Sequence, residues 1–410
     1  MSSRDFIYGK FSDFYNASST TITSPALLRQ RELGFLLFKG RIMLRHKVFA
    51  RLSDLRAFLG EVVPSDVYRS CAYYENPEAE MEKKGWLGAD LVFDIDADHI
   101  PTLCDKLHDE WTCTKCGFSG KGITPEACPA CEGQKFDART WPCEACLESA
   151  KEETTKLIDM LSADFGFSDR EVSVFFSGHR GYHVHVENEA VKTLDAMARK
   201  EIVDYVTGLG LSVLGGESKG RLARRKRRSR GFSLHDFGWN RRLKLGLRNF
   251  ILNATKEDLI KAGVKGNSAV ILRNKELILK RCIEEGRWSS VKGVSDGTWR
   301  KLAEYVKDAE SSKIDTVVTT DTHRLIRMNG TLHGKTGLRK VEFPAKHLVD
   351  FDPFEEAVAF KEGVVKVSVS DAPKFRLGGS VLGPYRRQTV EVPTAAAVLL
   401  ICRDRAKVAN

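Results

Sequence analysis

The stretch Asp90-Leu91-Val92-Phe93-Asp94-Ile95-Asp96-Ala97-Asp98 decides how the rest of the chain is interpreted. Side chains alternate between the two faces of a β-strand, so Asp94 and Asp96 point one way while Phe93 and Ile95 point the other. The apolar face predicts packing on a core. Two neighbouring carboxylates repel each other unless a cation lies between them. The alternative is an acidic strand end that runs into a turn, and an isolated Asp-x-Asp does not exclude it.

The composition is that of a globular protein with a basic excess. Its 410 residues suffice for two structural units, or for one domain with large insertions. Lys and Arg outnumber Asp and Glu by 65 to 55, which favours a polyanionic partner such as nucleic acid. No apolar run approaches the roughly 18–20 residues that span a bilayer, and residues 1–10 lack the apolar centre of a signal peptide. We therefore expect a cytoplasmic, nucleoid-associated protein without a membrane partner.

The cysteines are clustered, since seven of the ten lie between Cys104 and Cys146. In an intracellular chain such clustering indicates metal binding rather than disulfides. Two Cys-x2-Cys pairs supply four thiolates for one tetrahedral, structural Zn²⁺: Cys113, Cys116, Cys128 and Cys131. A second pattern brackets the first and predicts a second zinc site with three cysteines and one histidine: Cys104, His108, Cys143 and Cys146. For His108 a surface position is the alternative.

Apolar spacing predicts the remaining elements. Segments of 5–59, including Ser24–Phe38 with its Ser-Pro start, have helical spacing, whereas 62–75 and 86–98 are typical of strands. A helix is expected over 148–161, mostly helices over 190–305, and β segments from 341 to 401. Residues 219–230 carry a dense positive run, for which a solvated loop, nucleic-acid contact and a nuclear-localisation signal stay open.

Two Gly-containing segments could bind phosphate. The strand 171–176 runs into Ser177-Gly-His-Arg180-Gly-Tyr-His183-Val-His185-Val, where a hairpin with incidental histidines and a phosphate-binding turn are both compatible with the sequence. Strand signals at 314–321, which contain Asp315, are followed by His-Arg-Leu-Ile-Arg327-Met and by a loop with His333-Gly-Lys335-Thr-Gly. Small residues beside Lys and His allow phosphate to approach the backbone closely, although the loop is not a Walker A motif.

Taken together and in this order, these motifs resemble the catalytic small subunit of the archaeal–eukaryotic DNA primases. The acidic strand end, the Ser-Gly-His-Arg-Gly turn, the later Asp315 and the His-Gly-Lys-Thr-Gly loop carry the resemblance, and the wording of that loop favours the archaeal form. The resemblance covers roughly residues 1–200 and 300–390. It departs from the family in its extra cysteine pairs, because one zinc element is usual there.

The resemblance implies an α/β (α+β) fold, in which a mixed-sheet core of residues 1–195 and 305–410 carries a zinc-binding insertion, 100–147, and a mostly helical insertion, 196–304. It implies that Asp94, Asp96 and Asp315 hold two catalytic Mg²⁺ or Mn²⁺ ions. The nucleotide triphosphate would contact Ser177, Arg180, His183, Arg327, His333 and Lys335. Expected partners are a large primase subunit, a single-stranded DNA template and nucleoside triphosphates.

The expected activity is therefore de novo synthesis of short RNA, or also DNA, primers by a nucleotidyltransferase that uses two metal ions and releases pyrophosphate. Two alternatives remain. A repair or gap-filling polymerase of the same superfamily would extend a primer without starting one. A non-catalytic zinc protein would bind nucleic acid without incorporating nucleotides.

Overall fold

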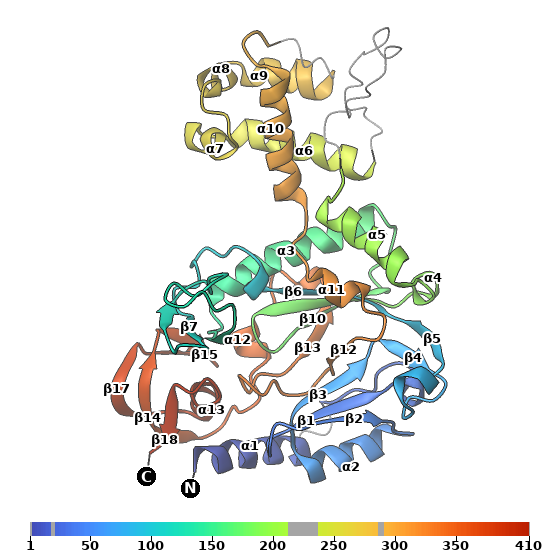
Figure 1. The fold of residues 1–410 in the computed structure, drawn as a ribbon, viewed down its shortest axis with the longest axis vertical. Helices are drawn as coiled ribbons and strands as arrows, with labels where there is room; N and C mark the ends of the chain where they lie inside the picture. The colour runs from blue at the N-terminus through green and yellow to red at the C-terminus, as the bar shows by residue number, and fades with distance from the viewer. Residues whose placement is uncertain (1, 18–20, 212–236, 286–290, 410) are drawn as a thin grey trace. The chain divides into compact units, whose positions relative to one another are not determined.

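The computed structural model describes residues 2–17, 21–211, 237–285 and 291–409 (Figure 1). The basic run at 219–230 lies outside them. The chain divides into two compact units, one of residues 1–155, 168–200 and 314–410, and one of 156–167 and 201–313. The predicted mixed α/β class is confirmed. The expected helical insertion at 196–304 overlaps the second unit, and its bounds stay a prediction.

The first unit contains two four-stranded sheets. One has the order β12-β3-β1-β2, built from Leu325–Arg327, Pro64–Ser70, Leu33–Leu37 and Met43–Lys47. The other has the order β13-β10-β11-β6, built from Val341–Pro344, Val172–Phe176, Gly181–Val186 and Leu91–Asp96. Neighbouring strands are antiparallel in both sheets.

The register of the second sheet positions the acidic strand. Asp94 on β6 lies opposite His183 on β11, which lies opposite Phe175 on β10. Because cross-strand partners share a face, these three side chains lie on one side of the sheet. Phe93 and Ile95, on the other side of β6, are fully buried, as the alternation predicted. The polar face looks toward the first sheet, since Arg69 of β3 lies 2.9 Å from His185 Nδ1.

The cysteine-rich segment forms a small three-stranded sheet and the start of a long helix. Its order is β8-β7-β9, from Ser119–Lys121, Glu110–Cys113 and Phe136–Arg139. Helix α3, Glu144–Ala163, follows directly.

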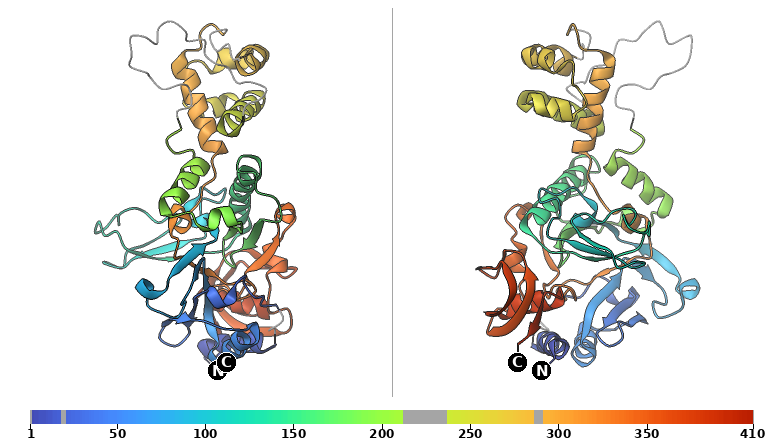
Figure 2. Two further views of the ribbon diagram at one scale, coloured as in Figure 1. Left: turned by 90° about the vertical axis from the view of Figure 1, so that its right-hand side faces the viewer. Right: turned by 60° about the vertical axis from the view of Figure 1, so that its left-hand side comes forward.

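The C-terminal part adds a sheet of order β17-β14-β18, from Tyr385–Pro393, Val364–Ala372 and Ala406–Val408. The two ends of the chain meet: the amide of Val408 donates to Ser3 Oγ at 3.0 Å, and N and C lie side by side in Figures 1 and 2. The other elements of this unit are α1 Ser3–Ala17, α2 Leu52–Val62, β4 Ala72–Tyr74, β5 Trp86–Ala89, α4 Glu189–Lys192, α11 Thr316–Thr320, α12 Pro353–Glu356, β15 Phe375–Leu377, β16 Ser380–Leu382, α13 Thr394–Cys402 and the short 3-10 turns Leu28–Gln30, Met81–Lys83, Ala97–His99 and Ala345–His347.

The second unit is helical. Helix α6 (Gly238–Asn253) packs on α10 (Asp296–Glu310) with the apolar faces that contain Leu243, Leu247 and Leu302. The buried Arg242 pairs with Asp164 at 2.6 Å. The remaining elements are α5 Ala196–Thr207, which begins in the first unit, α7 Lys256–Lys261, α8 Ser268–Arg273, α9 Lys275–Leu277 and a π-helical turn at Ile278–Glu284. None of the helices in the described parts of the chain is long and apolar enough to cross a membrane.

Three predicted elements are wrong. The helical spacing at Ser24–Phe38 belongs instead to a 3-10 turn and to β1, because an apolar run that is buried on both sides has no distinctive period. The strand expected at 314–321 is helix α11, since Asp315 caps it by accepting hydrogen bonds from the amides of Val317 and Val318. The tail also contains a buried helix, α13, among its strands.

Candidate active site

The three predicted aspartates gather at the end of β6. Asp94 and Asp96 project from the same face of the strand, and the amide of Asp315 donates to the Asp94 carbonyl at 2.8 Å. Burial, and then the negative charges of Asp96 and Asp315, raise the pKa of the Asp94 carboxyl to about 7. An uncompensated acidic cluster of this kind is stabilised by a cation.

The donor set fits hard divalent ions. Carboxylate oxygens are the ligands that Mg²⁺ and Mn²⁺ prefer. Two of the carboxylates are held by backbone amides: Asp96 Oδ1 accepts from Asp98 at 2.9 Å, and Asp315 Oδ1 accepts from Val317 at 2.9 Å. Within the described ranges, the groups whose ligand atoms all lie within 4.8 Å of one another are the two cysteine clusters, so the aspartates are spaced more widely. Ligands shared between two ions need no single point of convergence.

His183 connects the acidic cluster to a buried lysine. Its Nε2 lies 3.5 Å from Asp94 Oδ1, and its Nδ1 lies 3.0 Å from Lys340 Nζ. Burial and the nearby Lys340 lower the pKa of His183 well below its usual value, so the ring is neutral at pH 7. Burial, and then the nearby Arg69, also lower the pKa of Lys340 well below its usual value, so either group can donate in this contact.

The Ser-Gly-His-Arg-Gly turn connects β10 to β11, and its glycines permit two close approaches. Gly178 has a φ of +90°, and a Cβ there would lie 2.9 Å from His333 Cβ. A Cβ on Gly181 would lie 2.0 Å from the Ile95 carbonyl, which explains how β11 can lie so close to β6. Thr336 Oγ1 donates to the Gly178 carbonyl at 2.6 Å, and the rings of His179 and His333 stack with centroids 5.1 Å apart. The two predicted phosphate-binding segments therefore lie against each other.

Asp66 supports the second phosphate-binding segment, the loop that contains His333 and Lys335, from its buried side. This buried carboxylate accepts from Arg327 at 2.6 Å and from the Gly334 amide at 2.9 Å. The neighbouring Lys335 is exposed, yet partial desolvation of its ammonium group, and then the cations Arg403 and Arg41, lower its pKa. Crowded positive charges of this kind favour a bound polyanion.

The predicted nucleotide-binding residues therefore lie in different environments. Ser177, His333 and Lys335 belong to the joined segments, His183 contacts Asp94, and Arg327 supports the loop through Asp66. Arg180 points elsewhere: it is almost fully buried, and its guanidinium forms ion pairs with Asp109, at 2.7 Å, and with Asp98.

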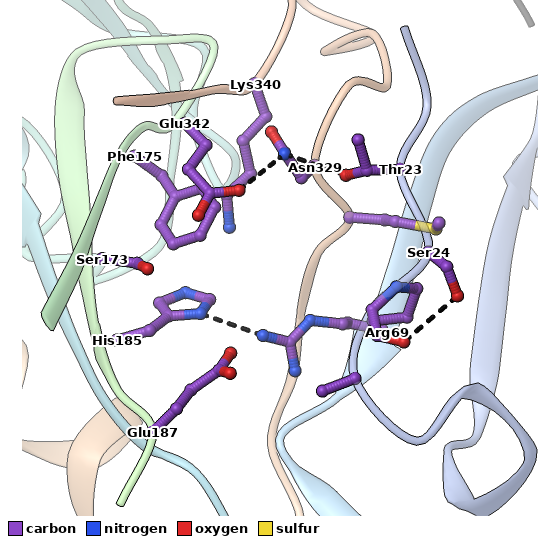
Figure 3. Close-up of a pocket in the computed structure, with 13 residues that line it drawn as sticks. Thr23, Ser24, Arg69, Ser173, Phe175, His185, Glu187, Asn329, Lys340 and Glu342 are labelled. Carbon is purple, nitrogen blue, oxygen red and sulfur yellow. Dashed lines mark hydrogen bonds between the residues drawn. The ribbon is translucent and has the colours of Figure 1, made fainter. Parts of the chain in front are cut away.

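A polar cavity of about 180 Å³ lies between the two sheets (Figure 3). Its lining includes His185, Arg69 and Lys340, and Glu342 approaches Asn329, whose amide donates to it at 3.0 Å. Lys340 thus lies both at the cavity and next to His183.

The four predicted ligands of each zinc site lie close together in the structure. For a tetrahedral ion with Zn–S bonds of about 2.3 Å, ligand atoms should be about 3.5–3.8 Å apart. In the all-cysteine cluster, formed by residues 113, 116, 128 and 131, the Cys113–Cys131 and Cys116–Cys128 Sγ pairs are 3.6 and 3.7 Å apart. In the mixed cluster, formed by residues 104, 108, 143 and 146, Cys104 Sγ lies 3.5 Å from Cys146 Sγ and 3.4 Å from His108 Nε2. Both clusters could therefore bind zinc, and four protein ligands are the number typical of structural zinc sites.

Three residues that contact the predicted site residues were not predicted from the sequence: Lys340, Asp66 and Asp109. Asp109 adjoins a predicted histidine ligand, and acidic partners of such ligands are common, so its position was a usable signal. For Lys340 and Asp66 the sequence contains no such signal, because their partners are 157 and 261 residues away.

The chain is similar over nearly its whole length to proteins of one known family. The sequence pattern of the family described as DNA primase small subunit matches residues 137–344. The chain is 32% identical to the DNA primase small subunit of Methanothrix thermoacetophila over 98% of both chains. It is 33% identical to the corresponding proteins of Cenarchaeum symbiosum, over 97% of both chains, and of Archaeoglobus fulgidus, over 98% of this chain and 97% of that one. The chain belongs to the DNA primase small subunit family.

Proposed function

We propose that the protein is the catalytic subunit of a DNA primase, which starts short RNA, or also DNA, chains on a single-stranded DNA template. Family membership supports a polymerase-type nucleotidyltransferase. The observation that carries the proposal is the meeting of Asp94, Asp96 and Asp315 at the end of β6. The Ser-Gly-His-Arg-Gly turn adjoins Asp96 and contacts the loop with Lys335. Nucleotidyl transfer needs both an acidic metal site and a holder for the triphosphate.

In this proposal Asp94, Asp96 and Asp315 hold two divalent ions, Mg²⁺ or Mn²⁺. Such ions, when bound, stabilise negative charge on the attacking 3′-hydroxyl oxygen and on the departing pyrophosphate. The neutral His183, whose Nε2 lies 3.5 Å from Asp94 Oδ1, packs beside that carboxylate without adding charge. The backbone caps on Asp96 and Asp315 orient the other two.

The triphosphate would lie on the joined segments. Lys335 supplies a cation. The Gly334 and Lys335 amides donate to Asp66 Oδ1 at 2.9 Å and to His333 Nδ1 at 3.1 Å, and these bonds fix the shape of the loop. Asp66 and Arg327 keep that loop in place from the buried side. Positioning of this kind lowers the barrier because the reacting groups are already oriented. The family also supports a large-subunit partner, for which we propose no docking surface.

The test is synthesis with and without a supplied primer, using template, nucleotides of both sugar types, and Mg²⁺ or Mn²⁺. We expect primer-free products, and we expect Asp94→Asn to lower their rate by at least about 10²–10³-fold, since it removes charge from the metal site. Asp54→Asn is the matched control, because Asp54 forms an exposed ion pair with Arg51 at 2.9 Å.

The other outcomes identify the alternatives. Extension of a primer without initiation would replace the proposal by a gap-filling polymerase. Template binding without any incorporation would reduce the protein to a nucleic-acid-binding role, and full activity in Asp94→Asn would remove Asp94 from the metal site.

A further inference from the structure

Asp109 connects the mixed zinc cluster to Arg180. Its Oδ1 lies 2.7 Å from Nδ1 of the zinc ligand His108, and it also accepts from the Trp141 amide at 2.8 Å. Both of its oxygens accept from Arg180 Nη1, at 3.0 and 2.7 Å. A carboxylate on the second nitrogen of a histidine ligand orients that ligand. Here the same carboxylate also holds a buried guanidinium.

Arg180 continues the connection to the end of the acidic strand. Its other nitrogen pairs with Asp98, and its carbonyl accepts from the Ala97 amide at 3.2 Å. Asp98 in turn donates its amide to the Asp96 carboxylate at 2.9 Å. The residue after Arg180, Gly181, is the register partner of Asp96. Each contact fixes the backbone that carries the Asp96 side chain.

A second connection runs in parallel. Lys106 lies between the ligands Cys104 and His108, and its buried Nζ donates to the Asp98 carbonyl at 2.9 Å. The metal-binding loop is therefore connected to Asp98 twice, directly by Lys106 and indirectly by Asp109 through Arg180.

The all-cysteine cluster has a different environment. Hydrogen bonds around its ligands join residues of the same small ribbon, such as the Cys128 amide to the Gly133 carbonyl at 2.9 Å and the Thr114 amide to the Lys135 carbonyl at 3.0 Å. Cys116 is exposed. This cluster stabilises the ribbon itself.

We propose that Asp109, Arg180 and Lys106 are positioning residues through which the mixed zinc cluster sets the geometry of the catalytic metal site at Asp96. The inference rests on the proposed function and deepens it. Zinc orders the loop 104–109, the loop holds Arg180 and Asp98, and these hold Asp96 ready to bind a divalent ion. Arg180 acts by this route rather than by contact with the triphosphate.

Asp109→Asn tests the relay selectively. The remaining Oδ1 can still accept from His108 and Trp141 and, at 3.0 Å, from Arg180. The new NH2 group instead faces the donor Arg180, which removes the shorter 2.7 Å contact and the negative charge of the ion pair. Asp105→Asn is the matched control, because Asp105 is an exposed carboxylate in the same loop. The measurements are zinc ions per chain, melting temperature, Mn²⁺ affinity by electron paramagnetic resonance, and kcat and KM of primer extension.

We expect Asp109→Asn to keep both zinc ions, to bind Mn²⁺ about 10–100-fold more weakly and to lose kcat with little change in the nucleotide KM, while Asp105→Asn behaves like the parent. Lys106→Met, which leaves every ligand and Asp109 intact, should weaken Mn²⁺ binding in the same direction. An Asp109→Asn protein with both zinc ions and parental Mn²⁺ affinity would overturn the inference. If Asp109→Asn loses zinc, parental Mn²⁺ affinity in Lys106→Met overturns it instead.

Failure of the proposed function gives a different result. In that case the parent protein itself makes no primers, whereas the difference in Mn²⁺ affinity between Asp109→Asn and Asp105→Asn remains measurable.

Discussion

The two cysteine clusters have almost the same ligand spacing but different surroundings. Cys146 of the mixed cluster is fully buried at the start of α3. Asp109 contacts the ligand His108 of this cluster and also Arg180, which connects it to the acidic end of β6. The all-cysteine cluster lies in a ribbon with exposed residues around Cys116. In the inference proposed above, two clusters with the same ligand chemistry have different roles, because the buried partners of a zinc ligand determine what the metal stabilises.

Removal of a ligand from the mixed cluster should have the largest effect. We expect Cys146→Ser to contain one zinc ion fewer, to lose several kcal/mol of stability and to make few or no primers, because binding of a structural zinc contributes about 10–16 kcal/mol to folding in small domains. Zinc analysis and thermal unfolding check this. Cys402→Ser, outside both clusters, is the control and should resemble the parent. A Cys146→Ser protein with parental melting temperature and activity would remove the distinction between the clusters.

A pH series should separate the carboxylates from both cysteine clusters. The pKa of Asp94 is raised to about 7 in the absence of cations, so below that pH a divalent ion must displace a proton. We expect Mn²⁺ affinity to fall about fivefold between pH 7 and pH 6, while both zinc ions stay bound. His183 does not titrate in this range, because its pKa is lowered well below 6.5. A flat affinity from pH 6 to 8 would contradict the prediction.

The same shift has a consequence for stability without metal. Because the folded-state pKa of Asp94 is raised, its protonated form favours the fold, and this contribution is lost as pH rises from about 4 through 7. Saturating Mg²⁺ should remove that loss, since the cation compensates the carboxylates. Thermal unfolding with and without Mg²⁺ at the two ends of the range measures the difference.

Removal of a ligand from the all-cysteine cluster should have the smallest effect on Mn²⁺ affinity and primer extension. Cys116→Ser should also contain one zinc ion fewer, yet keep Mn²⁺ affinity and primer extension within about twofold of the parent, because the hydrogen bonds of the ribbon are largely local. Amide exchange over residues 113–135 should rise. A tenfold loss of primer extension would show that the ribbon also acts on the reaction.

The candidate metal ligands and phosphate-binding segments could be recognised from short sequence motifs. The alternation around Asp94, the Cys-x2-Cys spacing and the order of the Gly-containing loops depend on neighbours a few residues apart, so strand faces and ligand sets follow from sequence. The secondary structure of short segments was predicted less accurately. Asp315 was expected on a strand and instead caps a short helix, because a capping hydrogen bond leaves no periodic pattern.

The candidate metal and phosphate ligands could be chosen from residue chemistry and spacing alone. Their contacts with one another depend on the folded chain. Arg180 pairs with Asp109 across 71 residues and Lys340 with His183 across 157, and buried polar groups take whichever partner the packing of sheets and loops provides. Burial then raises the pKa of Asp94 and lowers that of His183, because the cost of charge depends on the surroundings that the whole fold supplies.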